Sequence, residues 1–200
     1  MGSVRQRDRE PELEHDLGRH STLGYETLEM PGSLRYLEHG IPTPLVRWHQ
    51  HEECELHLIV ETRGKLFVGD YIGHFEPGNL VLTGPRLPHN WISSDGPDEV
   101  VHLRDMVLQF SETPLRQAGA EVGDLHSVLP LLERARHGIE FFDMSDVARD
   151  ALVRIKSSHG MARYGEFLIL LDQLARCTDY RLLSTVQMHR LPPAVHGADA

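Results

Sequence analysis

The sequence lacks several features that mark particular classes of protein. Its 200 residues include only two cysteines, too few for a disulfide-stapled secreted domain, so we expect a reducing, cytoplasmic location. Lys and Arg total 20 against 30 Asp and Glu, and the formal charge of -10 has the wrong sign for a chain that neutralises phosphates by itself. No apolar run approaches the roughly 20 residues of a membrane span, and the chain does not start with a signal-peptide pattern. We therefore expect no membrane segment and no direct contact with DNA.

What remains is the composition of a folded domain that is rich in histidine. Hydrophobic residues make up 40% of the chain, and its length allows a sizeable core. Histidine occurs 14 times, so imidazole ligands for a metal or a small molecule are plentiful. A single His-x-His pair is common by chance at this frequency, and only a longer pattern is informative.

The sequence pattern divides the chain into four segments. Residues 1–24 are polar and charged, which predicts a flexible arm because such a composition cannot offset the entropy of ordering. Residues 25–112 alternate with period two between Gly and Pro turns, which predicts an antiparallel β-barrel. Residues 113–185 change to helical spacing, and residues 186–200 predict a linker or a disordered tail.

Three helices are predicted in the third segment. The first runs from about Pro130 to just before Gly138, with Pro in its first turn and Gly after its end. The second follows Ser145 or Asp143 as N-cap and stops at Gly160. The third begins near residue 162, and the last two helices would form an αα-hairpin.

An apolar stripe on the third helix has two interpretations. It consists of Tyr164, Phe167, Leu168, Leu171 and Leu174. We expect it to form a homodimer through the C-terminal helices, because one short helix and one side of a barrel cannot hide it fully. The alternative is that the stripe belongs to the internal core.

The segment from residue 54 to residue 60 has two distinct faces. Alternation places four apolar side chains on one face, namely Cys54, Leu56, Leu58 and Val60. The other face carries Glu55, His57 and Ile59. The first face predicts core, whereas polar groups on a strongly hydrophobic strand are typical of the lining of a ligand cavity in a small barrel.

The most informative motif is an H-x-H-x3-E pattern formed by His49, His51 and Glu55. On one continuous strand these odd positions project to the same side, so two imidazoles and a carboxylate would converge. Such ligands suit one divalent transition metal, namely Zn, Ni, Mn or Fe, and His89 from another strand would complete the set. The alternatives are a metal-free ligand pocket and side chains that are solvated or bonded structurally.

Two further residues are candidates for ligand binding. His57 faces the same cavity as Glu55 by alternation, and its alternative role is that of a hydrogen-bonded core histidine. Trp91 follows His89 closely, so it is either a lid over the pocket or a plain core aromatic. The ligand-binding set is therefore His49, His51, Glu55, His57, His89 and Trp91.

The segment between Trp48 and Trp91 resembles the cupin domain of AraC-type transcriptional regulators. The resemblance rests on WHQHEECELHLIV and on LFVGDYIGHFEPGNLVLTGPRLPHNW, and it extends more weakly through residues 107–110, 137–141 and 171–184. It implies a cupin-type double-stranded β-helix, a jelly-roll barrel that binds a small-molecule effector, followed by helices that dimerise. The fold class is then mainly β with C-terminal helices. The resemblance also carries metal-ligand roles over to the four matching positions, His49, His51, Glu55 and His89.

The resemblance implies a non-catalytic sensing domain. Nothing after Ser184 resembles the helix-turn-helix half of that family, so we expect DNA contact only through a domain absent from this chain, which is either a truncation or a natural stand-alone cupin. The alternative is a small metal-dependent cupin enzyme, a dioxygenase or isomerase. In that enzyme His49, His51 and His89 hold Fe or Mn, and Glu55 is a ligand or a base.

Overall fold

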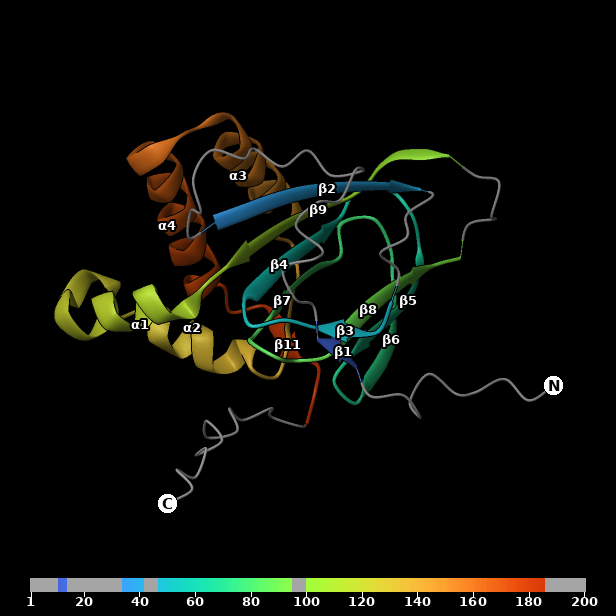
Figure 1. Ribbon diagram of the computed structural model, residues 1–200, viewed down its shortest axis with the longest axis horizontal. Coiled ribbons are helices and arrows are strands. Elements are labelled where there is room, and N and C mark those ends of the chain that lie inside the picture. The colour runs from blue at the N-terminus through green and yellow to red at the C-terminus, as the bar shows by residue number, and fades with distance from the viewer. Residues whose placement is uncertain (1–10, 14–33, 42–46, 95–99, 186–200) are drawn as a thin grey trace, which may run out of the picture.

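The computed structural model describes residues 11–13, 34–41, 47–94 and 100–185 (Figure 1). The tail predicted for residues 186–200 lies outside these residues, as does most of the predicted arm. Within that arm, Glu12 and Leu13 form the short strand β1, which pairs in parallel with residues 49 and 50. This part of the arm is thus a strand beside the H-x-H motif.

The described strands form two sheets, and every pairing except that of β1 is antiparallel. The first sheet has the order β1 (Glu12–Leu13), β3 (His49–Gln50), β8 (His89–Ser93), β5 (Gly64–Val68), β6 (Tyr71–Phe75). The second has the order β11 (Tyr180–Leu182), β10 (Ile139–Phe141), β7 (Leu80–Thr83), β4 (Cys54–Ile59), β9 (Val101–Phe110), β2 (Leu34–Ile41). The sheets share no strand among the described residues, so the barrel is built from two facing sheets. The predicted class, mainly β with C-terminal helices, is confirmed.

Four α-helices follow or interrupt the strands in the described part of the chain: α1 (Glu112–Glu121), α2 (Val128–Ala135), α3 (Ser145–Ser157) and α4 (Gly160–Arg176). A 3₁₀ turn, Gly123–Leu125, links the first two. As predicted, α2 has Pro130 in its first turn, and Gly138 lies beyond its end with φ +68. None of these helices is long and apolar enough to span a membrane.

The predicted caps around α3 were wrong. Met144 holds the N-cap position without a side-chain hydrogen bond, and Ser145 is already helical. Gly160 does not stop α3 but opens α4, where its φ of +56 lets the chain turn between the two helices. The predicted αα-hairpin of α3 and α4 is present, and an ion pair between Arg154 and Glu166 at 2.8 Å links the two helices.

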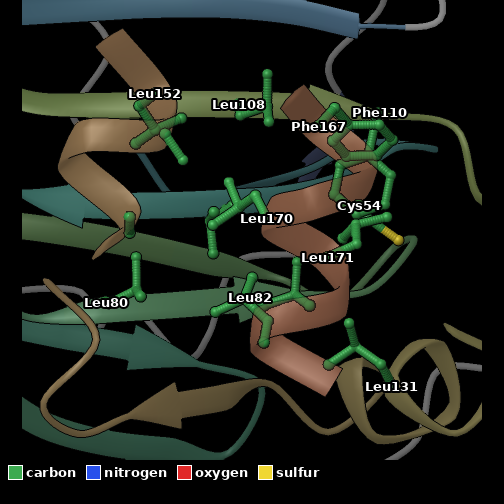
Figure 2. Close-up of a cluster of buried hydrophobic side chains, with 14 of the residues drawn as sticks. Cys54, Leu80, Leu82, Leu108, Phe110, Leu131, Leu152, Phe167, Leu170 and Leu171 are labelled. Atoms are coloured by element: carbon green, nitrogen blue, oxygen red, sulfur yellow. The ribbon is translucent and has the colours of Figure 1, made fainter. Parts of the chain in front are cut away.

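The alternation predicted for residues 54–60 is confirmed. Cys54, Leu56 and Leu58 lie in a large cluster between the second sheet and the helices, together with side chains of β7, β9, α2, α3 and α4 (Figure 2). The other face of β4 points between the two sheets. The second sheet therefore packs on helices with one face and lines the barrel interior with the other.

The apolar stripe of α4 is mostly internal core. Phe167, Leu171 and Leu174 are at most 3% exposed within the single chain, and Phe167 packs against Phe110 of β9 at 4.9 Å between ring centroids. The expectation that these three form an intermolecular seam was wrong, because the outer face of the second sheet needs this stripe as its cover. Tyr164 and Leu168 are partly buried against the same cluster.

Strands β10 and β11 lie within the segment for which helical spacing was expected. They extend the second sheet beyond β7 and bring the described end of the chain back to the barrel. There, Asp70 in the turn between β5 and β6 accepts hydrogen bonds from the Ser184 hydroxyl at 2.7 Å and the Thr185 N–H at 2.9 Å, and a third from the Thr185 hydroxyl. These bonds hold the last described residues on the first sheet.

Candidate functional site

The three side chains of the H-x-H-x3-E motif and their predicted partner, His89, converge in the barrel. One ligand atom from each of His49, His51, Glu55 and His89 lies within 4.8 Å of the others. Three of the four residues are buried, and His49 is half-buried. The geometry predicted for this group is therefore present, and its donor set fits one divalent transition metal.

These side chains do not converge from one continuous strand, as was predicted. Residues 49–55 do not form one continuous strand: β3 ends at Gln50 in the first sheet, and β4 begins at Cys54 in the second. The chain bends at Glu52, which is exposed, and at Glu53, which is partly exposed, and passes there from the first sheet to the second. His49 and His51 therefore meet Glu55 across the barrel interior.

The three imidazoles are oriented in the same way. Each donates its Nδ1 hydrogen to a backbone carbonyl two residues away: His49 to Arg47 at 2.9 Å, His51 to Glu53 at 3.1 Å and His89 to Leu87 at 2.7 Å. Since a carbonyl oxygen only accepts, Nδ1 must carry the hydrogen in each ring. This leaves Nε2 as the ring nitrogen that can bind a metal, an arrangement typical of metal-binding histidines.

Glu55 is the acceptor at the centre of the group. Its carboxylate lies 3.0 Å from His51 Nε2, 3.1 Å from His57 Nδ1 and 3.5 Å from His89 Nε2. Gln109 also donates to it at 3.0 Å. Burial alone would raise the pKa of Glu55, but the histidines around it hold that pKa well below its ordinary value. The carboxylate is ionised at neutral pH.

The Nε2 atoms and Glu55 are close enough together to share one cation. Burial, together with the neighbouring His89, lowers the pKa of His49 to about 3, so this ring is neutral at pH 7. A lone pair on Nε2 and a carboxylate oxygen repel each other unless a proton or a metal ion lies between them. A divalent metal would satisfy three imidazoles and one carboxylate at once.

A second polar chain runs from Glu55 into the wall of the second sheet. His57 lies between Glu55 and the fully buried Asp105, whose Oδ2 is 3.3 Å from His57 Nε2. Burial would lower the pKa of His57, but Asp105 and Glu55 outweigh it and raise that pKa. Burial would likewise raise the pKa of Asp105, but His57 and His39 hold it well below its usual range. The raised pKa favours the protonated form of His57, which lies between two carboxylates.

Trp91 forms one wall of the same region. Its ring stacks on His57 at 3.9 Å between centroids and 17° between planes, and it is 3% exposed. Because Trp91 lines the pocket and is buried, it is a wall rather than an exposed lid. Arg104 donates to the backbone carbonyl of Trp91 at 3.0 Å and fixes the strand edge there.

The pocket extends from the histidines across the inner face of the second sheet. It is lined by Arg35, Leu37, His39, Arg47, His49, Glu55, His57, Asn90, Trp91, Arg104, Asp105, Val107 and Gln109. His51 and His89 do not line it, but both contact Glu55 behind its wall. The predicted ligand-binding set thus divides into pocket residues and residues of the metal-type cluster.

Sequence reasoning missed the parts of this pocket that come from β2 and β9. Register pairs Gln109 with Glu55 on one side and with Arg35 on the other, so all three share a face. The signal was available, because Asp105, Val107 and Gln109 alternate with buried Met106 and Leu108. Two charged or amide groups in such a hydrophobic strand indicate a lined cavity.

The fold and the pocket define a cupin-type barrel with a largely polar pocket inside it. A family model described as AraC-like ligand binding domain matches residues 31–177, and the chain belongs to this family. No curated protein matches the chain.

Two solved structures are similar to the chain. A Cupin 2 conserved barrel domain protein from Salinispora arenicola CNS-205 is 16% identical with a TM-score of 0.36, and the match covers 52% of this chain and 82% of that one. The AraC-like transcriptional activator CuxR is 11% identical with a TM-score of 0.40, covering 73% of this chain and 52% of that one. The match spans about half the length of the activator.

Proposed function

We propose that the chain is the effector-sensing and dimerisation domain of an AraC-family transcriptional regulator. The observation that carries this proposal is the family match over residues 31–177 together with a lined pocket inside the barrel. A small molecule would bind in that pocket and control DNA binding by a helix-turn-helix domain that is not among these 200 residues. The regulator would act in the cytoplasm and would have no catalytic residue.

The mechanism would be linkage between two sites. An effector that binds one arrangement of the barrel and its helices more tightly than another shifts the population of the DNA-competent state by its differential affinity. The chain itself, with its charge of -10, would contact no DNA. This role is tested by reading the gene beyond codon 200. We expect an in-frame region there that encodes a basic helix-turn-helix domain. A stop codon directly after codon 200 would contradict the proposed regulator.

The cluster of His49, His51, Glu55 and His89 would hold one divalent transition metal, namely Zn, Ni, Mn or Fe. The bound ion would supply further coordination positions to a ligand in the pocket. The chain's own part is to orient the three imidazoles through their backbone carbonyls and to keep Glu55 ionised.

The metal is tested by elemental analysis of protein purified without a polyhistidine tag. We expect a stoichiometric transition metal in the parent chain and its loss from His51→Ala and Glu55→Ala. His74→Ala serves as the matched control, because His74 is exposed on β6. A parent chain without metal whose effector binding is lost in the two variants would indicate a bare ligand pocket. A metal content unaffected by either variant would contradict the site.

The same cluster supports a second candidate function. Three imidazoles and one carboxylate in a barrel also suit a metal-dependent dioxygenase or isomerase, with His49, His51 and His89 as ligands and Glu55 as ligand or base. Oxygen uptake by the Fe(II)-loaded chain would favour this enzyme over the sensor.

A further inference from the structure

Gln109 is a buried amide at the end of a hydrophobic strand, β9. Its register partners are Glu55 of β4 on one side and Arg35 of β2 on the other, and all three side chains line the pocket. Gln109 is 5% exposed. A polar side chain in such a place is costly unless both ends of its amide are hydrogen-bonded.

Both ends of the Gln109 amide are bonded, and the partners fix its orientation. Arg35 donates a guanidinium N–H to the carbonyl oxygen of the amide at 3.1 Å. A guanidinium only donates, so the amide oxygen must face Arg35 and the NH₂ group must face Glu55. There the NH₂ group donates to Glu55 Oε2 at 3.0 Å. Gln109 therefore aims a donor at the carboxylate of the histidine cluster.

The Glu55 carboxylate is held from outside the histidine cluster on both of its oxygens. Oε2 accepts from Gln109, and Oε1 accepts from His57 Nδ1 at 3.1 Å. Toward the cluster, Oε2 lies 3.0 Å from His51 Nε2 and Oε1 lies 3.5 Å from His89 Nε2. Each carboxylate oxygen has two lone pairs. One outer donor on each oxygen therefore leaves a lone pair on each for an ion among the histidines.

The two outer donors differ in what else they contact. His57 also lies 3.3 Å from Asp105 and stacks on Trp91, so its substitution disturbs a buried charge network. Gln109 carries no charge, and its amide bonds to Glu55 and Arg35. A substitution of Gln109 thus tests the support of the carboxylate without adding or removing a charge.

We propose that Gln109 is a positioning residue of the metal cluster, and that its N–H holds the Glu55 carboxylate where the three imidazoles present their Nε2 atoms. This inference rests on the proposed function, since it concerns the metal site of that function. A side chain that hydrogen-bonds a metal ligand orients that ligand, and its loss typically weakens metal binding about ten- to a hundredfold.

The test measures metal binding by the full chain after Gln109 is replaced. Gln109→Met keeps the length of the side chain and removes the amide. Competition with a chelator measures the Zn²⁺ affinity of metal-stripped protein, and the visible absorption of Co²⁺-loaded protein reports the ligand geometry. We expect Gln109→Met to raise the Kd for Zn²⁺ about ten- to a hundredfold and to shift the Co²⁺ bands, because Glu55 is no longer fixed.

Thr83→Val is the matched control from the strand on the other side of Glu55. Thr83 of β7 pairs with Glu55 and is fully buried. Its hydroxyl donates to the backbone carbonyl of Glu55 at 3.4 Å and not to the carboxylate. This variant should bind Zn²⁺ like the parent and leave the Co²⁺ spectrum unchanged. A merely structural role of Gln109 would make the two variants behave alike.

A second variant covers the case in which Gln109→Met does not fold. Gln109→Asn retains the amide but is shorter by one methylene, so it cannot reach Arg35 and Glu55 together. It should therefore weaken Zn²⁺ binding in the same way. Far-UV circular dichroism shows whether each variant is folded.

Three outcomes overturn the inference. It is wrong if the folded Gln109 variants bind Zn²⁺ as tightly as the parent and give the same Co²⁺ spectrum, or if Thr83→Val loses as much affinity as they do. Both of these results leave the metal site of the proposed function in place. A parent chain that binds neither ion overturns that metal site together with the role of Gln109.

Discussion

Asp105 is the residue on which the buried charges of the second sheet depend. It is fully buried and contacts His39, His57 and Arg104, so its removal leaves several donors without their anion. We expect Asp105→Asn to lower the free energy of unfolding by about 3–5 kcal/mol, because one partner of a buried charge network is lost. Urea denaturation measures this change. Asp146→Asn, at an exposed position in α3, is the control and should change stability by less than about 0.5 kcal/mol.

The same residue predicts a pH dependence. The pKa of Asp105 is depressed in the folded chain by His57 and His39, although burial opposes this. Its contribution to stability is therefore complete above the unfolded pKa of about 3.9 and is lost as the pH falls toward the folded value. The difference in unfolding free energy between the parent and Asp105→Asn should shrink below about pH 4. A difference that stays constant from pH 7 to pH 3 would contradict this assignment.

Helix α4 is predicted to behave as a core element. Leu171 is 3% exposed, whereas Ile169 in the same helix is 52% exposed. Leu171→Ala should lower the free energy of unfolding by about 2–5 kcal/mol, because it leaves a cavity between helix and sheet. Ile169→Ala is the matched control and should cost less than about 1 kcal/mol in the monomer. If urea denaturation gave equal losses of stability for Leu171→Ala and Ile169→Ala, α4 would not pack on the sheet through Leu171.

The segment after β11 is predicted to be held partly by the carboxylate of Asp70, in addition to backbone hydrogen bonds to residues 137 and 138. Asp70 accepts three hydrogen bonds from Ser184 and Thr185, and these donors lower the pKa of Asp70 below its usual range. Asp70→Ala should increase amide hydrogen exchange of residues 180–185 by about tenfold, because local opening becomes easier by roughly the worth of one charge-assisted hydrogen bond. Glu76→Ala, at an exposed position after β6, should leave this exchange unchanged. Unchanged exchange in Asp70→Ala would show that other contacts hold the segment.

Periodicity predicted most of the elements and failed where the tertiary context decides. It located α2, α3 and α4 and assigned the two faces of β4 correctly, because both depend on local spacing. It could not tell whether the stripe of α4 covers its own sheet or a second chain, since both interpretations require the same apolar residues. It also missed the break between β3 and β4, where a two-residue bend moves the chain to the other sheet without a Gly or Pro signal.

The candidate site was predictable to the extent that it is contiguous in sequence. His49, His51 and Glu55 lie within seven residues, and His89 was added from the resemblance and the expected strand return. Arg35 and Asp105 reach the same pocket only through the pairing of β2, β9 and β4. Strand order is a property of the whole fold, so the sequence pattern of a single strand could not place them there.

At the scale of the whole molecule, the oligomeric state depends on what the core leaves exposed. Met161 and Ile169 of α4 and Val153 of α3 are at least half exposed in the single chain. If the chain is the homodimer that we propose, Ile169→Glu should give monomers in sedimentation analysis and leave the monomer's circular dichroism unchanged, because a charge replaces apolar contact area. Gln173→Glu, also exposed on α4, controls for added charge. A parent mass that Ile169→Glu does not alter would place any dimer elsewhere.

Around the pocket, the alternation of side chains on β2 and β9 has a consequence for engineering the domain. The pocket residues Arg35, Leu37 and Val107 occupy one parity of their strands, and the residues that pack on the helices there, Leu34, Tyr36, Met106 and Leu108, occupy the other. Side chains of opposite parity point away from each other across the backbone. A library that keeps Asp105 and randomises only Arg35, Leu37 and Val107 therefore changes the pocket wall and leaves the helix-facing residues of β2 and β9 as they are.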